Sequence, residues 1–115
     1  MPTNEAGVVA SIVKAVRKEW PSAWIFKTVW NPWQMPGVPD LLFCIEGAFI
    51  GLEVKFQRPG ESDAAARGRA TQQQQHHIKK INKAGGKAAV VLSAEEALRV
   101  IRVAVEERNN GAQHH

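Results

Sequence analysis

The sequence predicts an α/β fold with the element order αβββαβα, in which helices pack on a mixed sheet. Three observations support this order. A helical pattern of apolar residues opens the chain, three apolar segments of strand length follow it, and two capped helices then enclose one more short apolar segment. With 115 residues, of which 44% are apolar and 23% charged, the chain is long enough for one hydrophobic core. We therefore expect a single domain over residues 1–115.

The first helix is expected over residues 4–19. Asn4 suits the N-cap because its side chain can accept a hydrogen bond from the first turn, and Trp20-Pro21 ends the helical pattern. The stripe of apolar residues at helical spacing consists of Val9, Ile12, Val13, Val16 and Trp20.

Three strands are expected next, at residues 24–30, 41–45 and 48–56. The Pro-rich segment 31–39 forms a loop between the first two. Glu46-Gly47 supplies a tight turn between the second and the third, so these two strands form a hairpin.

A polar loop at 57–70 leads to the second half of the fold. Thr71 is expected to cap a helix that runs to Ala84 and is closed by Gly85-Gly86, and residues 88–92 form a short buried strand.

Ser93 and Glu96 form a capping box for the last helix. Its inward face is expected to consist of Ala97, Leu98, Ile101 and Val105. The core then covers about residues 4–108, with 109–115 as a frayed tail.

Composition narrows the class of protein. The single cysteine, Cys44, excludes an internal disulfide, and no Cys/His cluster suggests zinc. The N-terminus has no basic region followed by an apolar run, so we expect no signal peptide. No apolar run approaches the ~20 residues of a membrane helix. These features fit the reducing cytoplasm best.

Positive charge is concentrated in one part of the chain. The net charge is +4, and residues 53–87 hold eight Lys or Arg against three acidic residues, so the rest of the chain is slightly negative. A basic block in an otherwise balanced domain favours a polyanion partner. The alternative is a solvated helix face and loop.

Two carboxylates are expected to face each other across the hairpin. In the register set by its turn, Asp40 lies directly opposite Glu53. Opposed Cβ atoms lie ~4.5–5.5 Å apart, and like charges there are destabilising. A hard divalent ion such as Mg²⁺ between the oxygens would relieve the repulsion. Otherwise Asp40 is a turn residue and Glu53 a surface residue, and a one-residue slip would separate them.

Three more polar side chains point toward this pair. Lys55 follows Glu53 by two residues and leaves the strand on the same face. Glu5 lies in the middle of the first helix's apolar stripe, where it is either exposed or reaches a metal on the sheet. Glu19, at the flank of the stripe, is the second choice.

One of four consecutive glutamines also faces inward. Ile78 and Ile81 mark the inward face of their helix, and Gln74 falls between them in helical angle, whereas the other three point sideways or away.

The ordered motifs resemble the virus-type replication-repair nuclease domain (VRR-NUC), a branch of the PD-(D/E)XK nucleases. They are an acid in the first helix, Gly37-Val38-Pro39-Asp40, a Gly-bearing hairpin turn, Glu53-Val54-Lys55, a Gln in the next helix, and Gly85-Gly86 before an apolar strand. The likeness runs from about Glu5 to Ser93. It implies a restriction-endonuclease-like αβββαβα core and a metal-dependent deoxyribonuclease that hydrolyses phosphodiester bonds.

The resemblance also implies a role for each matching residue. Asp40, Glu53 and the carbonyl of Val54 would bind Mg²⁺ or Mn²⁺, with Glu5 completing the site directly or through water. Lys55 would orient or activate the attacking water and offset charge on the phosphate. Gln74 would support Lys55 and the water.

Contacts to DNA are expected from the basic block, because phosphate contacts need Lys or Arg. The candidates are Arg58, Arg67 and Arg69 on the loop after the catalytic strand, and Lys79, Lys80 and Lys83 on the following helix. Trp30, Trp33 and Met35 flank the loop that delivers Asp40. We expect them to pack in the core or an interface rather than stack on bases.

Small standalone members of this family, of the phage and bacterial type, resemble homodimers that cut branched DNA such as Holliday junctions in repair and recombination. The first helix, the 24–35 region and the last helix are candidate dimer surfaces. A flap- or other structure-selective nuclease is an alternative. So is a catalytically silent DNA-binding module, although such a module is expected to lack Asp40, Glu53 or Lys55. A restriction-type enzyme would need more chain for base readout, and a structural protein would carry the motif by chance.

Overall fold

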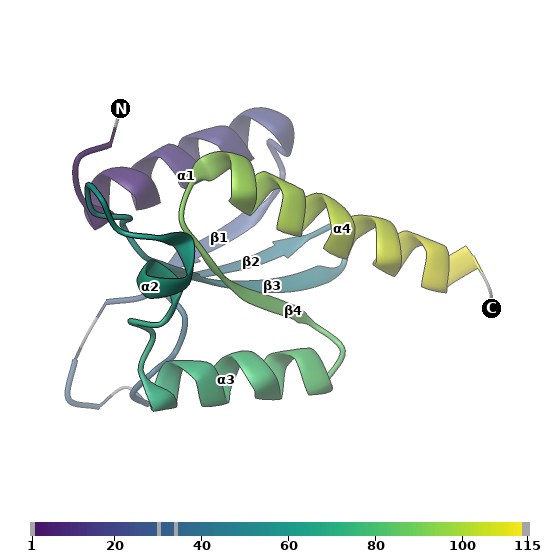
Figure 1. Ribbon diagram of the computed structural model, residues 1–115. Helices are drawn as coiled ribbons and strands as arrows, with labels where there is room; N and C mark the ends of the chain where they lie inside the picture. Colours follow the sequence, from purple (N-terminus) through teal and green to yellow (C-terminus); the bar gives the residue numbers. More distant parts are fainter. Residues whose placement is uncertain (1, 30, 34, 114–115) are drawn as a thin grey trace.

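The computed structural model describes residues 2–29, 31–33 and 35–113 (Figure 1). It confirms the predicted αβββαβα order and adds one short helix, α2. The elements are α1 (Glu5–Glu19), β1 (Trp24–Lys27), β2 (Leu41–Ile45), β3 (Ala48–Val54), α2 (Asp63–Arg67), α3 (Gln72–Lys83), β4 (Lys87–Val91) and α4 (Ala94–Gln113).

The four strands form one mixed sheet in the order β1-β2-β3-β4. The first two pairings are antiparallel and the β3–β4 pairing is parallel. Ile45 pairs with Ala48 and Leu41 with Leu52, which confirms the predicted hairpin register. The turn has positive φ at both central residues, Glu46 (50°) and Gly47 (84°), as a tight two-residue hairpin requires.

The core lies between the sheet and the helix pair α1 and α4, which cover one face, whereas α3 lies against the other (Figure 1). Alternate residues of β3 point into this core because side chains of a strand alternate between faces. The most deeply buried members include Ile12, Val16, Leu41, Phe43, Ile45, Ile50, Leu52, Val54, Val91 and Ile101.

Several boundaries differ from the sequence prediction. The polar loop 57–70 contains α2, whose N-cap Ser62 accepts a hydrogen bond from the backbone N–H of Ala65. The first strand ends at Lys27, and Trp30 lies outside the described residues. The expected tail is helical as far as Gln113, because no proline interrupts the backbone hydrogen bonds of α4. Residues 114–115 lie outside the description.

The predicted capping box of α4 is formed only in part. Ser93 Oγ accepts from the Glu96 backbone N–H, but the Glu96 carboxylate accepts from the N–H of Leu92 rather than from that of the cap residue.

In the described part of the chain, no helix is long and apolar enough to cross a membrane.

Gly37 fixes the end of the Pro-rich loop against α3. Its φ is +85°, and a Cβ there would lie 2.5 Å from the backbone carbonyl carbon of Gln73. The His77 ring contacts the Pro36 carbonyl oxygen at 3.1 Å. Only a residue without a side chain can approach the helix backbone this closely, so Gly37 sets the position from which Asp40 follows.

Gly37→Ala is expected to destabilise the protein more than Gly60→Ala. Both glycines have positive φ, but nothing lies within 4 Å of a Cβ built on Gly60. Gly60→Ala therefore costs only backbone strain, about 1–2 kcal/mol, and Gly37→Ala about 1–3 kcal/mol more from overpacking against α3. Urea unfolding of both variants measures the difference. Equal losses would contradict the close packing of Gly37 on α3.

Candidate functional site

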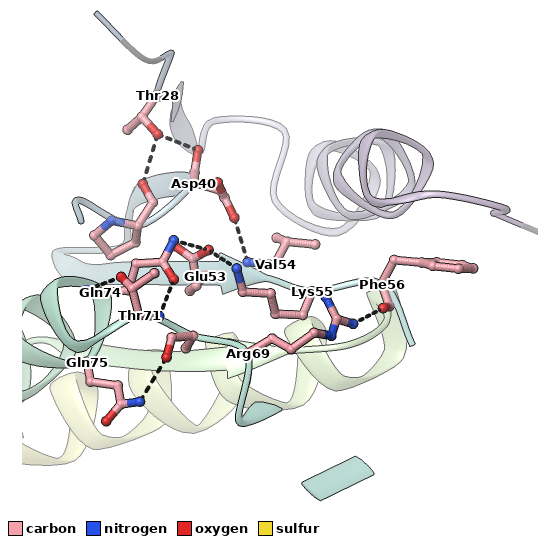
Figure 2. A network of polar contacts seen from close by, with 12 residues as sticks. Thr28, Asp40, Glu53, Val54, Lys55, Phe56, Arg69, Thr71, Gln74 and Gln75 are labelled. Carbon is pink, nitrogen blue, oxygen red and sulfur yellow. Dashed lines mark hydrogen bonds and ion pairs between the residues drawn. The ribbon is translucent and has the colours of Figure 1, made fainter. Parts of the chain in front are cut away.

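Four polar side chains meet where β3 ends beside the first turn of α3 (Figure 2). Asp40 directly precedes β2, and Glu53 is the second-to-last residue of β3. Lys55 is the first residue after that strand, and Gln74 comes from the first turn of α3. The structure thus brings together the four residues that the sequence predicted at the centre of the site.

Glu53 is the buried charged group of this site, with only 1% of its surface exposed. Its Oε2 accepts a hydrogen bond from Gln74 Nε2 (2.9 Å) and lies 3.4 Å from Lys55 Nζ. Its Oε1 is buried and has no hydrogen-bond partner among the described residues. Buried carboxylate oxygens are rarely left unpaired, so this atom is suited to bind a ligand.

Asp40 is held beside Glu53 by the backbone. Its Oδ2 accepts a hydrogen bond from the Val54 N–H (2.8 Å), which ties the side chain across to β3. Its carbonyl oxygen accepts from the Thr28 N–H (2.9 Å) and hydroxyl (3.2 Å). The paired register ends one step earlier, at Leu41 and Leu52, so Asp40 reaches Glu53 from the loop end rather than from within the strand.

Burial raises the pKa of Glu53 from 4.5 to about 8. Removal from water is the largest cause, because it disfavours the charged form, and the neighbouring charge of Asp40 raises the pKa further. Lys55 acts in the opposite direction but is outweighed. At neutral pH the metal-free carboxyl group therefore retains its proton for most of the time, and a bound cation would take the proton's place.

Gln74 is oriented by the helix cap. Its Oε1 accepts from the Thr71 N–H (2.8 Å) while Thr71 Oγ1 accepts from the Gln74 N–H (3.1 Å), a complete capping box. Because a backbone N–H can only donate, it selects the amide oxygen and leaves Nε2 to donate to Glu53. The capping box therefore fixes the amide so that it can bind only an acceptor at the site.

The donor set fits a hard divalent cation. Glu53 Oε1 has no partner among the described residues, and a second carboxylate, that of Asp40, lies beside Glu53. Oxygen ligands of this kind are those that Mg²⁺ and Mn²⁺ prefer. The expected ligand role of the Val54 carbonyl remains a prediction.

The two candidate helix acids lie apart from this pair. Glu5 is exposed in the first turn of α1, and its charge acts on Arg69. Within the described residues no group of three or more His, Cys, Asp or Glu is placed to hold a metal, so Glu5 does not join Asp40 and Glu53 in one cluster. Glu19 is bound to Arg102 of α4 (2.9 Å), at the other end of α1.

Two of the residues predicted to contact DNA also have partners within the chain. The guanidinium of Arg67 bonds to Glu96 and to the Val90 carbonyl. That of Arg69 bonds to Glu61 and to the Phe56 carbonyl. Both therefore hold the loop after β3 in place. Arg58, Lys79, Lys80 and Lys83 are exposed, so the predicted contacts to DNA rest mainly on them.

The aromatic loop before Asp40 does not pack in the core. Trp33 is 93% exposed and Met35 61% exposed, so packing in the core is wrong for both, and the alternative of an interface stays a prediction. Pro-rich loops of this kind run over the surface, because a buried loop would leave backbone polar groups unpaired. Trp30 lies outside the described residues.

Sequence reasoning missed two supporting residues. Thr28 anchors the Asp40 backbone, and its hydroxyl also donates to the Pro39 carbonyl (3.0 Å). Thr71 was expected only as a cap, yet its N–H orients Gln74. The spacing Thr-x-x-Gln is a capping-box pattern and would have predicted the second contact. No local pattern predicts the first contact, which depends on how β1 and β2 pair.

One solved structure, titled "VRR_NUC domain", resembles this chain with a TM-score of 0.52 and 20% sequence identity. The match covers 81% of this chain and 92% of that chain. No family model and no curated protein matches the sequence. At this identity the likeness shows the fold, and the fold predicted from the sequence is confirmed.

The free energy of unfolding of the metal-free protein is expected to fall as the pH rises from about 4.5 to about 8. In this range the unfolded chain has released the Glu53 proton while the folded protein keeps it, so folding binds a proton and becomes less favourable as protons become scarce. Above that range both states have lost the proton, and the contribution is gone.

Denaturation with urea across this pH range, in the presence of EDTA, measures the slope. Glu53→Gln carries no titrating group and is expected to remove this part of the slope. Glu106→Gln, at an exposed position of α4, is expected to keep it. A Glu53→Gln variant with the wild-type slope would contradict the assignment.

Proposed function

We propose that the chain is a divalent-metal-dependent deoxyribonuclease of the VRR-NUC type that hydrolyses phosphodiester bonds. One observation carries the proposal: Oε1 of Glu53 is buried beside Asp40 with no partner among the described residues, while Oε2 of the same carboxylate lies 3.4 Å from the Lys55 ammonium group. The resemblance of the motifs to that family and the likeness of the fold to a structure titled "VRR_NUC domain" support the same assignment.

The oxygens of Asp40, Glu53 and the Val54 backbone would hold Mg²⁺ or Mn²⁺, with Glu5 acting through water from the end of α1. When bound, the ion would lower the pKa of an attacking water and neutralise charge on the phosphate. In the hydrolysis, water loses one proton as its oxygen bonds to phosphorus, the bond from phosphorus to the leaving oxygen breaks, and the leaving oxygen takes up one proton.

Lys55 and Gln74 have separate tasks in this scheme. The Lys55 side chain is only 12% exposed, so its charge is poorly screened where the phosphate would gain negative charge. It would also orient the attacking water. Gln74 holds Glu53 Oε2, which leaves the other oxygen for the ion.

Branched DNA is the proposed substrate, with a four-way junction first and a flap second. Exposed Lys79, Lys80 and Lys83 lie on α3, the helix whose first turn supplies Gln74, so a DNA backbone bound along α3 would lead to the site. A homodimer would present two such sites to two strands of a symmetric junction.

A catalytically silent DNA-binding module is the alternative. It would use the same basic residues but would have no need of Asp40, Glu53 and Lys55 together. Their convergence on one point of the sheet favours the enzyme (Figure 2).

The decisive test is cleavage of labelled four-way junction, flap, duplex and single-stranded DNA with Mg²⁺, Mn²⁺ or EDTA. We expect metal-dependent cutting, with the junction cut fastest. Asp40→Ala and Lys55→Ala are each expected to lower the rate at least ~10²-fold, the scale for removing one group that stabilises transition-state charge. Lys14→Ala, on the exposed face of α1, is the matched control and should cut normally. Equal cutting by all variants would show a contaminating nuclease.

Gln74→Glu tests the role of the amide without changing its size. The new carboxylate cannot donate to Glu53, which slows cutting because Glu53 loses its fixed orientation, and its negative charge attracts the cation, so we expect tighter Mn²⁺ binding by calorimetry. Gln72→Glu, at an exposed position of the same helix turn, is the control. Wild-type Mn²⁺ affinity in Gln74→Glu would rule out this contact as part of the metal site.

A further inference from the structure

Among the described residues, no helix covers one half of the sheet on the face that carries α3. Two rows of side chains occupy this half, because directly paired residues share a face. The first row runs from Trp24 to its partner Cys44 and on to Phe49. In the second row Phe26 pairs with Leu42. We call these five residues the β1–β2 face.

The helix α3 packs on the other half of the sheet. Ile81 lies over β3, where a Cβ on Gly51 would be 3.1 Å from its Cδ1. Asn82 bonds to both backbone groups of Ala88 in β4. Trp24, Phe26 and Phe49 consequently keep 53%, 48% and 42% of their surfaces exposed, although each belongs to a regular strand.

We propose that the β1–β2 face is the surface on which two copies of this chain associate. Its composition is that of the core of a protein–protein interface, where Trp and Phe are enriched and charge is depleted. Nucleic acid is a poor partner for it, because residues 20–52 contain a single basic residue, Lys27, against Asp40 and Glu46.

The chain as a whole exposes more surface than is expected of a monomer of its mass, 7381 Å² at 12.7 kDa against about 6,200 Å². Trp24, Phe26 and Phe49 contribute to this surface, since each is at least 42% exposed on paired strands. Contiguous exposed aromatic surface of this kind marks an interaction site.

A second copy also fits the shape of the face. A packed helix occupies a layer of about 8–10 Å, and two sheets packed face to face lie ≈ 10 Å apart. The uncovered half of a second sheet can therefore fill the layer beside α3. In a two-fold dimer the β1–β2 face of one copy packs on the β1–β2 face of the other. Such an interface needs only a surface that fits itself. The five residues carry no charge that would favour a partner of opposite charge.

This surface borders the candidate site but contains none of its residues. On β3 the face ends at Phe49, about 13 Å along the strand from Glu53, whereas on β2 its Leu42 is two residues, about 7 Å, from Asp40. The association gives the proposed homodimer its surface, but it does not depend on nuclease activity and is tested without DNA or metal.

Size-exclusion chromatography with light scattering on the 115-residue chain, with EDTA present, tests the proposal. We expect a mass of twice 12.7 kDa for the wild type and a twofold lower mass for Trp24→Glu and for Phe26→Ser, each with a wild-type circular dichroism spectrum. Val103→Glu changes an exposed apolar residue on α4 (46% exposed) and should remain a dimer. A monomeric wild type would overturn the proposal, and so would a dimer that resists both face variants.

Cys44 provides a second test that needs no loss of folding. It is the only cysteine of the chain and lies in the face, so a short bis-maleimide is expected to convert the wild type into covalent dimers. A Cys44→Ser chain that carries Glu106→Cys on α4 should stay uncrosslinked. Crosslinking of the α4 cysteine but not of Cys44 would place the interface elsewhere and refute the proposal.

Discussion

The burial of Glu53 in the sheet is the constraint on which this structure depends. A carboxylate that loses its water must find partners or a proton. Gln74 and Lys55 satisfy one of its oxygens, whereas the other has no partner among the described residues. Apolar side chains at this position would give a more stable sheet, since even a paired buried charge is often weaker than good packing. Stability alone therefore does not explain the arrangement, whereas the proposed binding of a cation would.

Each partner of Glu53 is placed by a local feature of the backbone. The Glu46-Gly47 turn sets the hairpin register and with it the end of β3 beside Asp40. The Val54 N–H holds the Asp40 carboxylate, and the close approach of Gly37 to α3 positions the loop in front of it. The cap of α3 orients the amide of Gln74. Four features of the fold therefore bring Asp40 and Gln74 to Glu53.

The parts of this structure that the sequence predicted are those that local rules determine. The turn fixed the opposition of Asp40 and Glu53, because a hairpin register follows from its turn, and helical angle selected Gln74 among four glutamines. Apart from the local contact of Thr71 with Gln74, what sequence reasoning missed depends on partners far along the chain. Arg67 finds Glu96 29 residues later, and Glu19 finds Arg102 83 residues later. Arg67 was predicted to contact DNA because of its place in the basic block after the catalytic strand, and no sequence pattern indicated its bond to Glu96.

The β1–β2 face is left exposed because of the same contacts that complete the candidate site. At its first turn α3 is bound to Glu53 of β3, and at its last turn Asn82 binds it to β4. With both ends bound, the helix cannot shift toward β1 and β2 without releasing the Gln74 amide from the carboxylate. The other two long helices, α1 and α4, pack on the opposite face of the sheet and so do not cover β1 and β2 on this side (Figure 1). Covering Trp24 and Phe26 from within the chain would therefore disrupt the site, and a surface from another molecule avoids that conflict.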